Sequence, residues 1–251
     1  MGDAERDFRS LVDDATAVAL QGWDFSFLSG RAVSQPLPWD YVRLARGAAR
    51  RARRVLDVDT GGGEVLAAIA PPAGSIAVEP HPPNAVLAAA ALESLQVEVR
   101  GRTSARLPVA DGEVDLVLNR HGALDLDEAA RVLSEGGLLI SQQVGDRNDV
   151  EINDAFGVPL ADGSALTSPE ATTAAASAAG FGVERCEEAW PRTAYLDVGA
   201  LVLQLRAVPW QVPSFDVEKH VEQLRRVHHS ICEHGSFTVT GHRLLLVAQR
   251  R

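Results

Sequence analysis

The chain of 251 residues is poor in cysteine, with only Cys186 and Cys232. Two cysteines cannot build a disulfide framework, and their placement matches no zinc motif. No apolar run approaches the roughly 20 residues that a membrane-spanning helix needs. The acidic N-terminus, with Asp3, Glu5 and Asp7, does not resemble a signal peptide. These absences predict a cytoplasmic protein that does not cross a membrane.

Positive charge is also scarce, because 24 Lys and Arg face 34 Asp and Glu and the net charge is −10. This balance argues against a chain built mainly to grip phosphate backbones. The local exception is a run of six arginines between Arg43 and Arg54. A nucleic-acid patch is one interpretation of this run. The interpretation we favour is the solvated face of an alanine-rich helix, since no aromatic residues interleave with the arginines.

One stretch, Val55–Leu66, organises the rest of the chain. It has the pattern of a buried strand from Val55 to Val58, a glycine turn and the start of a helix. Asp57 would then lie near the carboxyl end of this strand, where it can accept hydrogen bonds from a ligand. Glu79 closes a second short strand, and an acid about 20 residues past such a turn commonly holds a ribose diol.

The spacing Asp57-x-Asp59-x-Gly61-x-Gly63 resembles motif I of the class I S-adenosylmethionine (SAM)-dependent methyltransferases, including the methyltransferase type 11 group. A nicotinamide dinucleotide is the weaker alternative, because Leu66 stands where its fingerprint wants a third glycine. The chain departs from the family at Asp59, where glycine is usual. This carboxylate either crowds the carboxylate of SAM or faces its amino group.

Two further strings resemble the same family. Leu107–Val117 reads Leu-Pro-x-x-Asp-Gly-x-x-Asp-Leu-Val, and Arg131–Gly137 resembles the turn before the family's fifth strand. The resemblance implies an α/β fold with a doubly wound, mostly parallel, seven-strand Rossmann-like sheet. It also implies SAM as cofactor and S-adenosyl-L-homocysteine as product. The implied cofactor-binding residues are Asp57, Asp59, Thr60, Gly61, Gly63, Glu79, Thr103, Ser104 and Asn119.

The expected fourth strand, Val114 to Leu118, delivers Asn119 and His121 to the carboxyl edge of the sheet, where ligands of open α/β sheets bind. His121 is the best candidate for a general base, since its ordinary pKa lies near neutrality. A structural histidine is the alternative. Gln142 and Gln143 end the fifth strand and either orient a substrate or cap the loop.

The chain is expected to have an N-terminal helical cap or lid (1–48), a SAM-binding core (49–190), a helical insertion (191–236) and a last strand of the core sheet (237–251). The segment before motif I is rich in aromatic residues, beginning at Trp23. By resemblance, the cap and the insertion shape a substrate pocket. The predicted substrate-binding residues are Arg31, Trp39, Tyr41, Gln142, Gln143, Tyr195 and Trp210, with His220 as a further lining candidate.

A metal site is not predicted. His228 and Cys232 have a usable spacing on one helix face, but no second cluster supplies further ligands. The expected function is transfer of a methyl group from SAM to an oxygen or nitrogen atom of a small molecule, mainly by positioning the acceptor. The alternatives are a SAM-binding protein without catalysis, a methyltransferase that acts on nucleic acid, and a non-enzymatic interaction module. The oligomeric state is left open.

Overall fold

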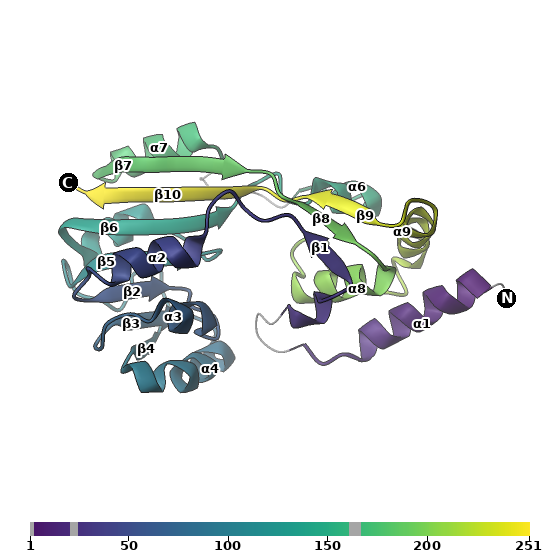
Figure 1. The fold of residues 1–251 in the computed structure, drawn as a ribbon, viewed down its shortest axis with the longest axis horizontal. Coiled ribbons are helices and arrows are strands. Elements are labelled where there is room, and N and C mark those ends of the chain that lie inside the picture. The colour runs from purple at the N-terminus through teal and green to yellow at the C-terminus, as the bar shows by residue number, and fades with distance from the viewer. Residues whose placement is uncertain (1–2, 21–24, 161–166) are drawn as a thin grey trace. The chain divides into compact units, whose positions relative to one another are not determined.

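The computed structural model describes residues 3–20, 25–160 and 167–251, which form two compact units (Figure 1). The first, here called the sheet unit, consists of Pro38–Gly145, Ser164–Ala189 and Arg243–Arg251. The second, the helical unit, consists of Met1–Leu37, Asp146–Gly163 and Trp190–His242. Trp23 lies outside the described residues. Among the described residues, no helix is both long and apolar enough to span a bilayer.

The sheet unit is built on a seven-stranded sheet with the order β4-β3-β2-β5-β6-β10-β7. The first five strands in this order are mutually parallel, and β10 is antiparallel to both of its neighbours. This mostly parallel seven-strand sheet confirms the predicted fold class. The strands are β2 (Val55–Val58), β3 (Ile76–Glu79), β4 (Glu98–Gly101), β5 (Val114–Arg120), β6 (Leu133–Val144), β7 (Phe181–Ala189) and β10 (Arg243–Arg250).

Helices cover both faces of this sheet, as a doubly wound fold requires (Figure 1). One face packs Leu56, Val117 and Leu139 against the buried Ala129 and Ala176 of α5 and α7. Side chains alternate between the faces of a strand, so Val55 and Asp57 point to the opposite face from Leu56. The helices of the unit are α2 (Tyr41–Ala49), α3 (Glu64–Ile69), α4 (Pro82–Leu92), the 3-10 helix η2 (Glu93–Leu95), α5 (Leu126–Val132) and α7 (Pro169–Ala178).

Short polar side chains begin these helices where the sequence places them. Asp40 accepts a hydrogen bond from the backbone N–H of Arg43 at the start of α2. The sequence Ser168-Pro169-Glu170 predicts a helix start with Ser168 at its N-cap, and Ser168 does accept a hydrogen bond from the N–H of Ala171 at the start of α7. Each cap satisfies a backbone N–H that has no partner within its helix, for a typical gain of about 1 kcal/mol.

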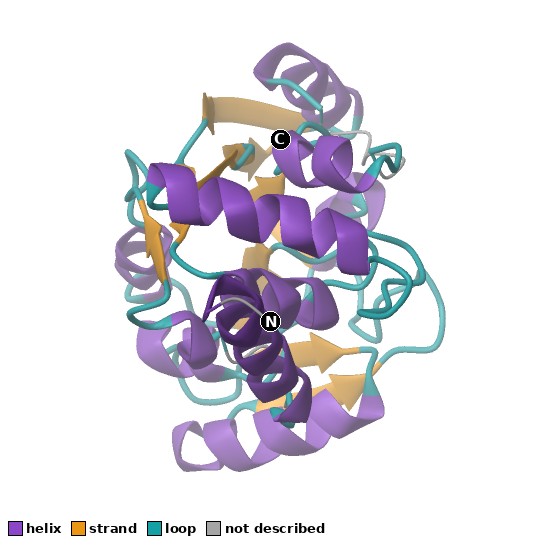
Figure 2. Cartoon of the chain, turned by 90° about the vertical axis from the view of Figure 1, so that its right-hand side faces the viewer, coloured by secondary structure: helices purple, strands orange, loops and turns teal. Residues whose placement is uncertain are grey.

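The helical unit contains a three-stranded antiparallel sheet with the order β1-β8-β9. Its apolar core includes Phe8, Phe156, Leu201 and Ile231, which come from four different helices. Figure 2 shows the helices, strands and connecting loops of the chain in separate colours. The elements of the unit are α1 (Asp3–Ala17), η1 (Ser26–Leu28), β1 (Ala32–Ser34), α6 (Val150–Phe156), β8 (Arg192–Tyr195), α8 (Val198–Ala207), α9 (Val221–His234) and β9 (Phe237–Thr240).

The structure corrects the expected last strand of the core sheet (237–251). This segment forms two strands in two different sheets, β9 and β10. Gly241 and His242 separate them, and the backbone N–H of Gly241 bonds to the carbonyl of Pro191 instead of continuing a ladder. The expected helices of the insertion exist as α8 and α9, but β8 precedes them and β9 follows them. Strands β1 and β8 and helix α6 had no clear signal in the sequence, and β9 was expected only as part of that single last strand.

Candidate functional site

The chain order of the parallel strands defines a topological switch point between β2 and β5. From β2 the chain moves outward through β3 to β4, and it then returns to β5 on the other side of β2. The adjoining loops therefore diverge at the carboxyl ends of these two strands, and open α/β sheets bind ligands in the resulting crevice. Val58 is paired with Asn119 across this boundary. The predicted site residues on both strands consequently lie at the same edge.

The glycine turn after β2 has the backbone shape that its sequence predicts. Gly61 and Gly63 both have positive φ angles, of 65° and 85°. A Cβ atom at Gly63 would also lie 3.1 Å from the side chain of Leu92, so a larger residue would push α3 away from α4. Gly63 thus serves both the turn and the packing of α3 against α4. The dinucleotide fingerprint instead uses a third glycine for close helix packing, at the position that Leu66 occupies here.

Glu79 closes the glycine turn from the end of the neighbouring strand β3. Its carboxylate accepts a hydrogen bond of 2.7 Å from the N–H of Gly61 and one of 2.8 Å from the N–H of His81. The residue is 5% exposed. Each carboxylate oxygen has a second lone pair, so both can accept a further hydrogen bond from a ligand hydroxyl.

Asp57 is a buried acid at the switch point. Burial, together with the charge of the nearby carboxylate of Asp59, raises its pKa to about 7. The hydroxyl of Thr60 approaches Asp57 closely enough to lower its pKa, but the contact does not have the geometry of a hydrogen bond. This buried hydroxyl has no hydrogen-bond partner among the described residues. A polar ligand atom placed here would satisfy it.

Asp59, the departure from the family pattern, has a φ of 58° in the left-handed region that favours glycine. Its carboxylate accepts one hydrogen bond of 2.8 Å from the N–H of Ala123 and one of 3.0 Å from Arg102. Burial raises the pKa of Asp59, and the charge of Arg102 opposes that shift. In this structure the carboxylate therefore joins the loops that follow β2, β4 and β5.

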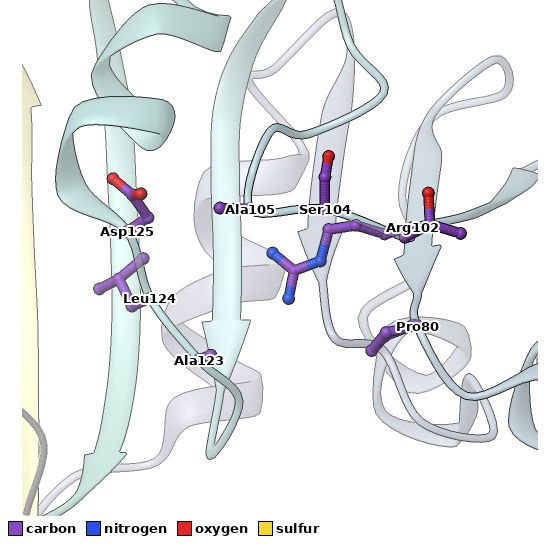
Figure 3. A pocket seen from close by; sticks show the side chains of 8 residues that line it. Pro80, Arg102, Ser104, Ala105, Ala123, Leu124 and Asp125 are labelled. Carbon is purple, nitrogen blue, oxygen red and sulfur yellow. The ribbon is translucent and has the colours of Figure 1, made fainter.

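A pocket of about 470 Å³ adjoins this ion pair (Figure 3). In the figure the guanidinium of Arg102 extends from the end of its strand toward the segment around Ala123. Thr103 and Ser104, which the sequence predicted as cofactor-binding residues, are in the wall of the pocket. The lining residues are Pro80, Arg102, Thr103, Ser104, Ala105, Ala123, Leu124 and Asp125.

Across the switch point, uncharged side chains replace the carboxylates. Asn119 is fully buried and donates a hydrogen bond of 3.0 Å to the carbonyl of Val58. Its carbonyl oxygen accepts from Ser141 and from Gln143, and Gln143 also donates to Ser141 at 2.7 Å. Gln143 is thereby tied to β5 by its side chain, in addition to the backbone ladder.

Gln142 lies between two ring nitrogens. Its carbonyl oxygen accepts a hydrogen bond of 2.8 Å from the indole N–H of Trp39, and its amide nitrogen lies 2.8 Å from Nε2 of His121. The backbone of His121 is in the left-handed region, with a φ of 62°, and its N–H bonds to the carbonyl of Gln142. The structure thus brings three residues predicted to act on substrate into one chain of contacts.

The surroundings of His121 make it a weak base. The residue is exposed as a whole, but protein atoms crowd its ring, and this desolvation lowers its pKa to about 3 together with the charges of Arg120 and Arg243. The imidazole is therefore neutral at pH 7. The predicted role as a general base stays a prediction, and both the low pKa and the contact with Gln142 favour a hydrogen-bonding role.

Tyr41 lies in the same unit, where burial raises its pKa well above its usual value with help from the charge of Asp57.

The remaining predicted substrate residues belong to the helical unit. Arg31 forms a two-pronged ion pair with Asp197, which caps α8. Tyr195 is 3% exposed in an apolar core, whereas Trp210 is 53% exposed. His220 stacks on Phe215. A role for these four residues toward a substrate stays a prediction.

Sequence reasoning assigned no role to Arg102 and Arg120, which both lie at this edge of the sheet. Each was identifiable in principle, because Arg102 directly follows β4 and Arg120 ends β5. The expected lack of a metal site is not contradicted, since the described residues contain no group of three or more potential ligands. His228 and Cys232 approach to 3.6 Å but have no third partner of that kind.

Comparison with solved structures identifies the fold. A protein from Bacillus halodurans assigned as a methyltransferase is similar at 21% identity and a TM-score of 0.61, over 84% of this chain and 98% of that one. The YcgJ protein from Bacillus subtilis is similar at 18% identity and a TM-score of 0.60, over 84% and 98%. The [4+2]-cyclase SpnF is similar at 16% identity and a TM-score of 0.53, over 97% and 94%.

No family model and no curated protein matches this sequence. The chain has the fold of the class I SAM-dependent methyltransferases. At these identities the comparisons concern the fold, so the activity has to be argued from the site.

Proposed function

We propose that this protein is a SAM-dependent methyltransferase that transfers a methyl group to an oxygen or nitrogen atom of a small molecule, with S-adenosyl-L-homocysteine as product. The observation that carries the proposal is the set of three carboxylates, Asp57, Asp59 and Glu79, around a glycine turn at the switch point. A pocket of about 470 Å³ lies beside them.

The charge of this set fits the cofactor. SAM has a cationic sulfonium and a cationic amino group against one carboxylate, so its net charge is positive. Among the described residues, neither Asp57 nor Glu79 forms an ion pair with a basic side chain, whereas Asp59 pairs with Arg102. The orphan hydroxyl of Thr60 supplies a further polar contact. A cationic nucleoside therefore suits this edge of the sheet better than a dinucleotide with two phosphates.

Glu79 would hold the ribose hydroxyls, and the segment from Asp57 to Gly63 would hold the methionine end. Thr103 and Ser104 would border the base in the pocket. When bound, SAM supplies an already activated methyl group, so the protein has little covalent chemistry to perform. The residues of β5 and β6 would orient the acceptor in line with the methyl group, and positioning of this kind can account for several kcal/mol of a reaction barrier.

A thermal melt with SAM, S-adenosyl-L-homocysteine, NAD and no ligand tests the cofactor. A ligand at one hundred times its dissociation constant stabilises the native state by about 2.7 kcal/mol. We expect stabilisation by the two SAM species and none by NAD. Stabilisation by NAD alone would overturn the proposal. Turnover of SAM across a panel of small acceptors then tests methyl transfer.

A second function is favoured by one comparison. SpnF has this fold over nearly its whole length and is a [4+2]-cyclase, so the fold also supports a reaction other than methyl transfer. The low pKa of His121 and the neutral side chains beside it are compatible with a site that only orients a substrate. Under this alternative SAM would bind and stabilise the protein, but no acceptor would gain a methyl group.

A further inference from the structure

The hydrogen bond between Trp39 and Gln142 has a fixed direction. An indole nitrogen can only donate, so the atom of Gln142 that faces Trp39 at 2.8 Å must be the carbonyl oxygen. The amide nitrogen of Gln142 must then face His121. This assignment does not depend on how the two ends of the amide were distinguished, because the opposite orientation would set two N–H donors against each other.

The same logic fixes the proton on His121. The amide nitrogen of Gln142 lies 2.8 Å from Nε2 of the imidazole and can only donate to it. Nε2 therefore carries the lone pair, and the single proton of the neutral ring is on Nδ1. Nδ1 of His121 makes no hydrogen bond with any of the described residues. His121 thus presents an N–H donor, on a residue that is exposed as a whole.

Arg120 adds a positive charge next to this donor. It is exposed, it ends β5 directly before His121, and it forms no ion pair or hydrogen bond with any described residue. Desolvation by the surrounding protein lowers the pKa of Arg120, and Tyr41 and Asp57 oppose this shift only through their charges. The charge of Arg243 also reaches His121. Donors and positive charge therefore coincide at the carboxyl end of β5, which contrasts with the carboxylates after β2 and β3.

We propose that Trp39 and Gln142 hold His121 in its Nδ1–H form, so that His121 and Arg120 together form a subsite for a carboxylate of the methyl acceptor. Guanidinium groups suit carboxylates because they offer paired N–H donors. Trp39 and Gln142 act through His121 and are positioning residues. This inference rests on the proposed function, since it names the class of acceptor, and it predicts an anionic small molecule.

The proton position can be measured without any ligand. Long-range ¹H–¹⁵N correlation spectra of the histidine rings, with the His121 signals assigned from the His121→Asn variant, should show the Nδ1–H pattern at pH 8. Gln142→Glu places a carboxylate, which only accepts, in the same space and should move the proton to Nε2. Trp39→Phe removes the donor while keeping an aromatic ring, and should give a mixture of the two forms. Gln249→Glu, at the other end of the sheet, should leave the pattern unchanged.

Acetate and acetamide are probes of the subsite, because they have similar shapes and only acetate is charged. Titrated at pH 8 into the complex with S-adenosyl-L-homocysteine, acetate should shift the His121 signals with an affinity at least about tenfold above that of acetamide, equivalent to about 1.4 kcal/mol. Arg120→Gln should abolish this preference, and Gln142→Glu should reduce it. An Nε2–H pattern in the wild type, or equal affinities for the two probes, would overturn the inference.

These measurements distinguish failure of the carboxylate subsite from failure of the proposed function. Failure of the proposed function would appear as absence of stabilisation by SAM and its product. The ring spectra of the unliganded protein and an acetate titration without nucleoside still test the subsite in that case. If SAM binds normally while acetate shows no preference over acetamide, the subsite is wrong and the cofactor assignment stands.

Discussion

The carboxyl edge of the sheet divides into two halves of opposite character. The acidic half, Asp57, Asp59 and Glu79, follows β2 and β3, and its side chains are carboxylates that bind the backbone of the glycine turn and Arg102. The amide half, Asn119, Gln142 and Gln143, lies on β5 and β6, and its contacts are among uncharged groups. The difference supports the proposed placement of the cationic cofactor on one side and of the substrate, oriented by fixed donors, on the other.

The largest expected effect is on stability, through the buried acid of the acidic half. The pKa of Asp57 is about 7 in the folded protein, against an ordinary value of 3.8. Because the folded state holds this proton more tightly, the contribution of Asp57 to stability is greatest at low pH, falls as pH rises from about 4 to 7, and is level above that. The difference corresponds to about 4 kcal/mol.

Asp57→Asn should therefore be more stable than the wild type at pH 8 by up to about 4 kcal/mol, with the advantage vanishing near pH 4. Urea unfolding at several pH values measures this. SAM affinity of the wild type should also rise from pH 6 to 8, since a cationic ligand favours the ionised carboxylate. If the stability difference between Asp57→Asn and the wild type were independent of pH, the raised pKa of Asp57 would not be its cause.

The next effect is on cofactor binding. Glu79→Gln keeps only one of the two acceptors that bind Gly61 and His81, and it removes a negative charge. We expect SAM affinity to fall by about ten- to a hundredfold, as for the loss of a charged hydrogen bond. Isothermal titration calorimetry measures this. Glu98→Gln removes an acid that pairs with Arg100 at the start of β4 and should bind SAM normally.

A substitution in the amide half should give the opposite pattern. Gln143→Leu removes two donors from a buried network and leaves Ser141 as a donor to Asn119. We expect a loss of stability of about 1–2 kcal/mol, a SAM affinity changed by less than about threefold, and a larger fall in acceptor turnover. Gln249→Leu is the matched control. A fall in SAM affinity as large as that of Glu79→Gln would remove the distinction between the halves.

The smallest effect is expected at Asp59. Glycine relieves a left-handed backbone by about 1 kcal/mol but loses the pair with Arg102 and the acceptor for Ala123. These terms nearly cancel, so Asp59→Gly should change stability by less than about 1 kcal/mol and SAM affinity by less than about fivefold. Asp59→Asn, which tolerates the same φ, separates charge from backbone. A fiftyfold loss of SAM affinity in both variants would show that the carboxylate of Asp59 contacts the ligand directly.

Sequence reasoning found most of the sheet unit because its signals are local. The apolar runs of β2, β3 and β5 and the cap at Ser168 each depend on neighbouring residues. The helical unit was harder to predict. Its strands β1, β8 and β9 are only three or four residues long, and they pair residues such as Ala32 and Tyr195 that lie far apart in the chain. No local periodicity identifies such a sheet.

The sequence by itself determined the glycine turn and the order of acids and amides along the edge of the sheet, because strand ends and turn residues are set by local backbone preference. Only the tertiary structure decided what each polar group faces. It joined Asp59 to Arg102 and Ala123, and it aligned Trp39, Gln142 and His121 so that the direction of one hydrogen bond fixes the next. These contacts span up to about a hundred residues, and hydrogen-bond geometry exists only once the strands and loops are placed in space.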